Sequence, residues 1–215
     1  MASAAVIVPV LFVLLAAGMT GCIGAGGLVL PSHYYRLDLP ATPSDVTAPA
    51  PSPAKVLLRV QLADALKGPK IVEAKSDYEL AFMDSHRWGE PLGRGISRLV
   101  AAQLKPGFAD VQATPIQAGF ESDYRVDLTV EKLWGMPNGD IVLDARWMVT
   151  DAHEKPLTSG HYTIRQKGWD SGDYRAYAER VSKLMAGLSK EILATIVKLE
   201  AQEAKETQAS STLKE

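Results

Sequence analysis

Two alternating segments between residues 124 and 151 constrain the fold more than any other feature of the sequence. In "YRVDLTVEKLWGMPNGDIVLDARWMVTD", apolar and polar residues alternate on both sides of Asn138-Gly139. Alternation with a period of two predicts strands with one buried face, and Asn-Gly is the pair favoured in two-residue type I′ turns. We therefore predict an antiparallel hairpin that presents an apolar face to a core.

A two-residue loop at this position also predicts which residues meet across the hairpin. Leu128 would face Val149 on the apolar side, and Glu131 would oppose Arg146 on the polar side. Apolar pairs and opposite charges both stabilise an antiparallel ladder. The predicted register is therefore consistent on both faces of the hairpin.

Two further segments have the spacing of amphipathic helices. The first lies near residues 90–105, and the second is long and C-terminal, with Asp170 or Ser171 as its expected cap. The apolar stripe of the second helix consists of Tyr174, Tyr177, Val181, Leu184, Leu188, Ile192, Thr195 and Leu199. A helix of this length would extend past a small sheet, so its part near residues 192–199 is a candidate binding surface for a neighbouring subunit.

These elements predict an α+β fold, a two-layer sandwich in which both helices pack on one face of a mostly antiparallel sheet. Residues 32–200 would form one domain, with a proline-rich loop at residues 40–54. The segment "SHYYRLDLP" at its start has strand character and either joins the sheet, which we expect, or belongs to the stalk. Residues 201–215 are polar and without periodicity, which predicts a disordered tail.

The N-terminal segment has the character of a lipoprotein signal. No residue from 4 to 21 is charged, and small residues directly precede Cys22, the only cysteine of the chain. We interpret residues 1–21 as a signal peptide, Cys22 as the acylated residue and residues 22–31 as a flexible tether. Met19 stands where such signals usually carry Leu, and no basic residue precedes the apolar run. The alternative interpretation is an uncleaved anchor helix.

Composition and motifs argue against several functional classes. A formal net charge of −2 is not that of a nucleic-acid-binding protein. One cysteine makes neither an internal disulfide nor a zinc cluster, and the four histidines, His33, His86, His153 and His161, are not spaced as metal ligands. No P-loop, HExxH motif or nucleophile elbow is present. We therefore expect no enzymatic activity, no metal site and no cofactor.

The stretch from the strand-like segment at residues 78–83 to the first expected helix carries candidate binding residues. Tyr78, Trp88 and Pro91 lie in a stretch rich in aromatic and turn-forming residues. One interpretation is that Trp88 fills the core beneath the helix. The other is that the three residues contact a protein partner or lipid beside a strand edge.

The order of these motifs resembles the ABC-type transport auxiliary lipoproteins, the paraquat-inducible protein C family. A lipobox-like "MTGC" is followed by "HYYRLDLP", then by "RWGEPLGRGISRLVAAQL", then by a Tyr-x-Val-x-Leu-x-Val strand, and finally by the helix "DYRAYAERVSKLMAGLSKEI". The resemblance covers about residues 32–199, and the segment 87–92 is its most diagnostic part. The long proline-rich insertion departs from the family pattern.

This resemblance implies a lipid-anchored periplasmic subunit of an intermembrane lipid transport system. Its partner would be a protein with mammalian-cell-entry (MCE) domains, whose conduit it would dock at the outer membrane of a Gram-negative bacterium. A homo-oligomer is expected because an MCE ring is a symmetric target. Ile23 follows the cysteine where an Asp would retain the protein in the inner membrane. The alternative is a structural lipoprotein of envelope assembly, and a hydrolase with an unrecognised site is a third hypothesis.

Overall fold

The computed structural model describes residues 31–38, 51–114 and 120–212. The chain divides into two units, Met1–Pro31 and Ser32–Glu215, and every element described here belongs to the second. In chain order the elements are β1 (His33–Tyr35), β2 (Ser52–Leu62), η2 (Asp64–Leu66), β3 (Lys70–Ser76), β4 (Glu79–Trp88), α2 (Leu92–Leu104), η3 (Lys105–Gly107), β5 (Phe108–Ala113), β6 (Tyr124–Gly135), β7 (Ile141–Asp151), β8 (Pro156–Gln166) and α3 (Tyr174–Thr212).

The strands form one eight-stranded sheet organised around β6. Along one edge, β6 pairs with β7, which in turn pairs with β8. The other edge of β6 pairs with β2 and, at Gly135, with β3. Strand β3 pairs in turn with β4, and β4 pairs with β1. The two longest ladders are antiparallel, as the sequence predicts, but β2 is parallel to both of its neighbours, β5 and β6.

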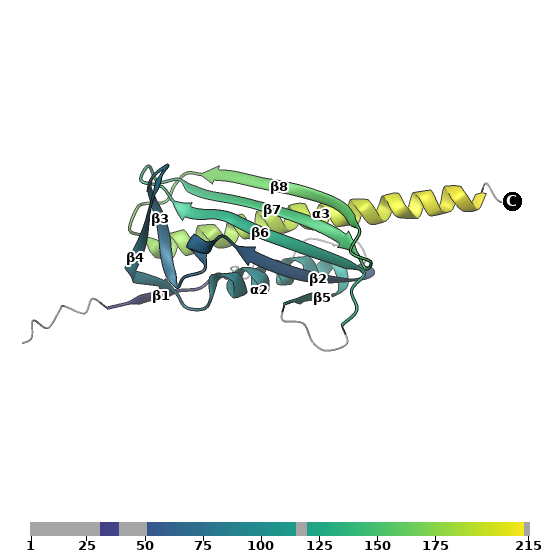
Figure 1. The fold of residues 1–215 in the computed structure, drawn as a ribbon, viewed down its shortest axis with the longest axis horizontal. Helices are drawn as coiled ribbons and strands as arrows, with labels where there is room; N and C mark the ends of the chain where they lie inside the picture. The colour runs from purple at the N-terminus through teal and green to yellow at the C-terminus, as the bar shows by residue number, and fades with distance from the viewer. Residues whose placement is uncertain (1–30, 39–50, 115–119, 213–215) are drawn as a thin grey trace, which may run out of the picture. The chain divides into compact units, whose positions relative to one another are not determined.

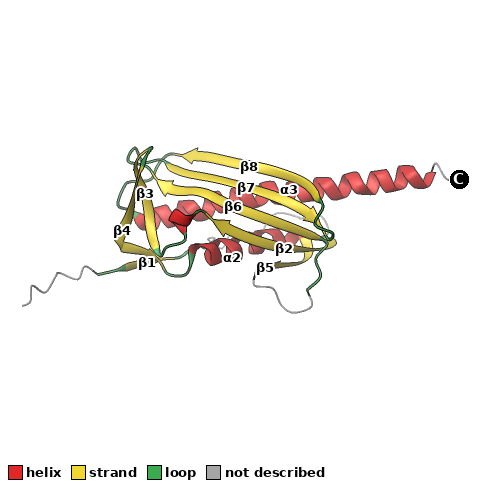
Figure 2. Cartoon of the chain, in the orientation of Figure 1, coloured by secondary structure: helices red, strands yellow, loops and turns green. Residues whose placement is uncertain are grey.

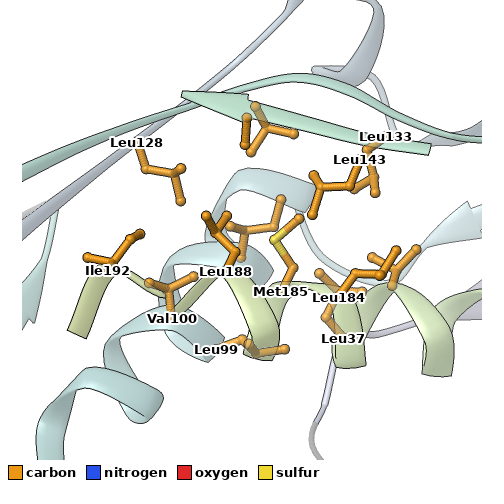
Figure 3. Close-up of a cluster of buried hydrophobic side chains, with 14 of the residues drawn as sticks. Leu37, Leu99, Val100, Leu128, Leu133, Leu143, Leu184, Met185, Leu188 and Ile192 are labelled. Atoms are coloured by element: carbon orange, nitrogen blue, oxygen red, sulfur yellow. The ribbon is translucent and has the colours of Figure 1, made fainter. Parts of the chain in front are cut away.

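Both helices pack on one face of the sheet, so the predicted α+β class is confirmed (Figures 1 and 2). The core lies between the layers and includes Val56, Leu58, Ile71, Ile96, Leu99, Val100, Leu128, Leu133, Leu143, Tyr177, Leu184, Met185, Leu188 and Ile192. In Figure 3, Leu128 and Leu143 of the sheet are directed toward Leu188 and Met185 of α3. The opposite face of the sheet carries ion pairs such as Arg59–Asp127 and Arg146–Glu131.

The β6–β7 turn differs from the predicted two-residue turn. The Met136 N–H donates to the Asp140 carbonyl (2.7 Å), and the Gly139 N–H donates to the Met136 carbonyl (3.0 Å). These bonds enclose a three-residue loop, and Gly139 has a φ of 80°. A type I turn closed by a left-handed glycine is the usual form of such a loop. Asn-Gly therefore does mark the turn, but one residue later than in a type I′ loop.

The longer loop shifts the hairpin register, so the predicted pairing of Leu128 with Val149 is wrong. Leu128 pairs with Trp147, and a bulge follows Val130. The loop shifts the register by one residue and the bulge adds a second, so the residues beyond the bulge keep their predicted faces. The ion pair between Glu131 and Arg146 still forms at 3.3 Å.

Three element boundaries also differ from the prediction. Asp173, rather than Asp170 or Ser171, caps α3, because its Oδ1 accepts a hydrogen bond from the Ala176 N–H (3.0 Å). Helix α3 continues to Thr212, into the stretch for which the sequence predicts a disordered tail. Strand β2 begins at Ser52, inside the segment assigned to the proline-rich loop.

Candidate functional site

The structure separates the residues that the sequence analysis singled out. Cys22 lies outside the described residues. Tyr78 precedes β4 and Pro91 follows it, so the length of this strand separates the two surface residues. Trp88 is only 6% exposed and packs against Tyr177, with ring centroids 6.2 Å apart. It is a core residue and offers no surface to a partner.

The β3–β4 hairpin instead exposes two aromatic side chains. Tyr78 at its tip is fully exposed, and Phe82 on β4 is 47% exposed. A cavity of about 310 Å³ lies between the hairpin tip and the sheet, with Trp134 and Val142 among its lining residues. Phe82 was not singled out from the sequence, although it stands in the same strand-like run as Tyr78. Exposed aromatic residues at a hairpin are typical of protein contacts.

An aromatic cluster joins β1, β3 and β4 to the start of α3. The ring of His86 stacks on Tyr174 (3.9 Å between centroids) and on His33 (5.3 Å). Tyr35 Oη lies 2.9 Å from His86 Nδ1, within hydrogen-bond distance. The Tyr174 hydroxyl donates to the buried carboxylate of Glu73 (2.6 Å). These contacts hold β1 against the helix.

Burial sets the protonation behaviour of this cluster. Burial, and next the neighbouring imidazole of His33, lower the pKa of His86 below its usual range. Burial, and next the hydrogen bond to Glu73, raise the pKa of the Tyr174 phenol. The fold therefore favours the neutral form of both groups. Stability contributed by neutral His86 is lost as the pH falls below the pKa that this histidine has in the unfolded chain.

Replacing His33 by alanine is expected to raise the pKa of His86 toward its ordinary value. The substitution removes one of the two causes that disfavour the charged imidazole, and burial remains as the other. An NMR titration of the His86 ring protons measures the change. His161→Ala is the control, because His161 lies on β8 beside Asp144 and is not part of the cluster. An unchanged His86 pKa in His33→Ala would contradict this account of the shift.

One group of side chains has the composition of a nucleophile, base and acid triad but not its geometry. His161 Nε2 lies 2.6 Å from Asp144 Oδ1 and 2.9 Å from Thr163 Oγ1. A catalytic histidine has to contact the nucleophile through one nitrogen and the carboxylate through the other. Here a single nitrogen makes both contacts, so the group is a surface hydrogen-bond cluster.

The described part of the chain contains neither a metal-binding group of side chains nor a membrane-spanning helix. No three His, Cys, Asp or Glu side chains there are arranged to hold a metal ion. None of its helices has both the length and the apolar character needed to span a bilayer.

An apolar groove lies beside the C-terminal half of α3. This α3 groove, of about 640 Å³, is lined mainly by Ser52, Pro53, Pro106, Leu193, Val197 and Glu200. Val197 is 40% exposed. Tyr124 also lines the groove; its hydroxyl donates to Glu203 (3.2 Å), and burial followed by the nearby glutamates raises the pKa of this phenol. The groove lies in the part of α3 that the sequence analysis proposed as a binding surface for a neighbouring subunit.

Comparison with known proteins gives a family match and a fold match. Residues 35–193 match the family described as "ABC-type transport auxiliary lipoprotein component". A search of curated proteins gives no match. A crystal structure of an uncharacterized protein is similar over 78% of this chain and 99% of its own, with 19% identity and a TM-score of 0.63. A Xanthomonas campestris protein is similar over 81% of this chain and 99% of its own, with 16% identity and a TM-score of 0.67.

Proposed function

The chain belongs to the ABC-type transport auxiliary lipoprotein family, and on this premise we propose that it docks the conduit of an MCE/ABC-type intermembrane lipid transporter at the outer membrane. The match over residues 35–193 is the observation that carries the proposal, because it covers most of the domain. The family is one of auxiliary transport components and not of enzymes, which agrees with a role in binding.

The anchor of this subunit would be Cys22. The thiol follows small residues at the end of an uncharged apolar run, which is the pattern of a lipoprotein signal. Acylation by more than one chain gives firm membrane attachment, since each buried methylene contributes about 0.8 kcal/mol. Ile23 after the cysteine supports sorting to the outer membrane, with the domain in the periplasm.

The contact with the MCE partner would include the tip of the β3–β4 hairpin. Tyr78 is fully exposed there, and Phe82 extends the aromatic surface along β4. Pro91, also exposed, follows the opposite end of β4 and would belong to a separate contact. Several copies of the subunit would bind one symmetric ring, so a homo-oligomer is part of the proposal.

Tyr78→Ser is expected to weaken capture of the MCE-domain partner about tenfold, since aromatic anchors at interfaces commonly contribute more than ~1 kcal/mol. Co-purification from detergent-solubilised membranes, followed by titration of the purified partner, measures the loss. Tyr34→Ser is the matched control, because it removes a tyrosine that is 66% exposed on β1. Equal weakening by both variants would contradict a contact at the hairpin.

The same experiment separates the transport role from a structural role in envelope assembly. Failure of the unaltered protein to capture any MCE-domain partner would overturn the transport proposal and leave the structural lipoprotein as the better hypothesis. MCE and permease genes adjacent to the gene for this protein would support the transport role.

A further inference from the structure

The α3 groove presents apolar side chains from separate parts of the fold. Leu193 and Val197 belong to α3, and Val197 is 40% exposed. Pro53 of β2 and Pro106 of η3 also line the groove, and both prolines are exposed. Gly107 allows Leu193 to pack closely against η3, because a Cβ at this position would lie 2.4 Å from Leu193 Cδ1. The groove therefore offers apolar contacts from a helix and from the segments beside it.

Carboxylates surround the Tyr124 hydroxyl at this groove. Asp123 and Glu200 line the groove, and Glu203 accepts a hydrogen bond from Tyr124 (3.2 Å). After burial, the charges of these three carboxylates raise the pKa of the Tyr124 phenol, so all three act on the same point. None of the described lining residues is a lysine, arginine or histidine. The groove therefore combines apolar walls with a negative potential.

The two carboxylates that line the groove have uncharged partners within the chain. Asp123 Oδ2 accepts a hydrogen bond from the Lys55 backbone N–H (2.8 Å), and Glu200 Oε1 accepts one from the Ser52 hydroxyl (2.5 Å). Among the described residues, neither carboxylate forms a salt bridge with a lysine or arginine side chain. Their charges are therefore available to a cation on the molecule that occupies the groove.

These features fit an amphipathic basic segment better than other occupants. Asp123 and Glu200 would repel an anionic lipid headgroup. A second copy of the chain carries a net charge of −2, so it has no overall attraction to a negative groove. A segment with both apolar and basic residues matches the walls and the charge together, and amphipathic helices commonly bind proteins in this way.

We propose that the α3 groove binds an amphipathic segment of another protein, in which lysine or arginine residues lie beside apolar ones. The apolar side chains of this segment would cover Leu193 and Val197, and its basic side chains would lie near Asp123 and Glu200. A volume of about 640 Å³ is within the usual range for a binding pocket. The groove shares no residue with the β3–β4 hairpin, so this contact is separate from the one proposed there and does not depend on the transport role.

Binding of two labelled peptides to the full chain in nonionic detergent tests the proposal. The basic peptide carries leucines at helical spacing and lysines at the other positions, and the acidic peptide has glutamates in place of the lysines. The basic peptide is expected to bind at least about tenfold more tightly at low salt, because the groove carboxylates attract one peptide and repel the other. Fluorescence anisotropy measures both affinities, and the difference should shrink as added salt screens the charges.

Two variants separate the contribution of charge from that of the apolar walls. Glu200→Gln should weaken binding of the basic peptide about threefold, and the glutamine can still accept the hydrogen bond from Ser52. Val197→Ser should weaken binding of both peptides. The control is Glu179→Gln, which removes the same charge from an exposed position on α3 that pairs with Lys183 (2.7 Å) and lies outside the groove.

The proposal is overturned if neither peptide binds, if the two bind with equal affinity, or if Glu200→Gln and Glu179→Gln have equal effects in proteins with native helix content. Sedimentation of the unaltered protein tests for a second copy of the chain in the groove. A dimer that dissociates in the Val197→Ser variant would place that copy there and would also overturn the proposal.

Discussion

Replacing Cys22 by alanine is expected to abolish acylation of the protein completely. The chain has no other thiol, so no second acceptor for a diacylglycerol is available. Without the acyl chains the signal segment should not be removed, because lipoprotein processing requires the modified cysteine. Labelling cells with radioactive fatty acid and following the size of the precursor measures both effects.

The control for this experiment is Met19→Leu, which makes the segment before Cys22 more like a standard lipobox. It should retain labelling, and more rapid processing would show that Met19 is the weak point of the signal. Continued labelling of the Cys22→Ala protein would refute the lipoprotein interpretation. If the unaltered protein is bound to the membrane but not cleaved, the anchor-helix alternative is favoured.

Leu188→Ala is expected to lower the free energy of unfolding by about 2–5 kcal/mol, the range for removing a buried leucine side chain from a packed core. Leu188 is fully buried on α3, facing the sheet beside Met185 (Figure 3). The shortened side chain leaves a cavity at the contact between the two layers. Urea unfolding followed by circular dichroism measures the change in stability.

Lys190→Ala on the same helix is the matched control, and its effect should stay within about 0.5 kcal/mol. Lys190 is exposed, so its truncation leaves no cavity. Equal destabilisation by the two variants would contradict the packing explanation, because both substitutions introduce alanine, the best helix former, and differ only in the cavity that they leave.

The local elements of this fold are predictable because their periodicity is strong. Alternation between residues 124 and 151 predicts β6 and β7, and the helical stripe from Tyr174 predicts α3. The exact turn is not predictable in the same way, since Asn-Gly suits both a two-residue loop and the observed three-residue loop. The register then depends on one residue in the loop and on the bulge after Val130.

The strands that pair with β2 cannot be predicted from periodicity, because they lie far away in the sequence. β2 lies between β5 and β6, which begin more than 50 residues later in the chain. The aromatic cluster is equally non-local, since His33, His86 and Tyr174 come from three distant segments. Trp88 was ambiguous for another reason: an aromatic residue beside turn formers suits both a core and an interface.

The candidate surfaces were predictable in part. Tyr78 is as exposed as a binding residue requires, and residues 192–199 do border a groove. The hydrogen bonds of Asp38 and Ser52 with α3 join residues more than 140 positions apart, so no local pattern predicts them.

The position of α3 in the chain has a consequence for the order of folding. This last element supplies Tyr177, Leu184, Met185, Leu188 and Ile192 to the core, so the apolar face of the sheet is incomplete until nearly the whole polypeptide has been synthesised. Cores built from distant segments fold slowly and expose apolar surface in the meantime. If the chain is exported as proposed above, late completion would leave the apolar face of the sheet unassembled during passage. It also makes truncation before Tyr174 far more damaging than loss of the residues after 203.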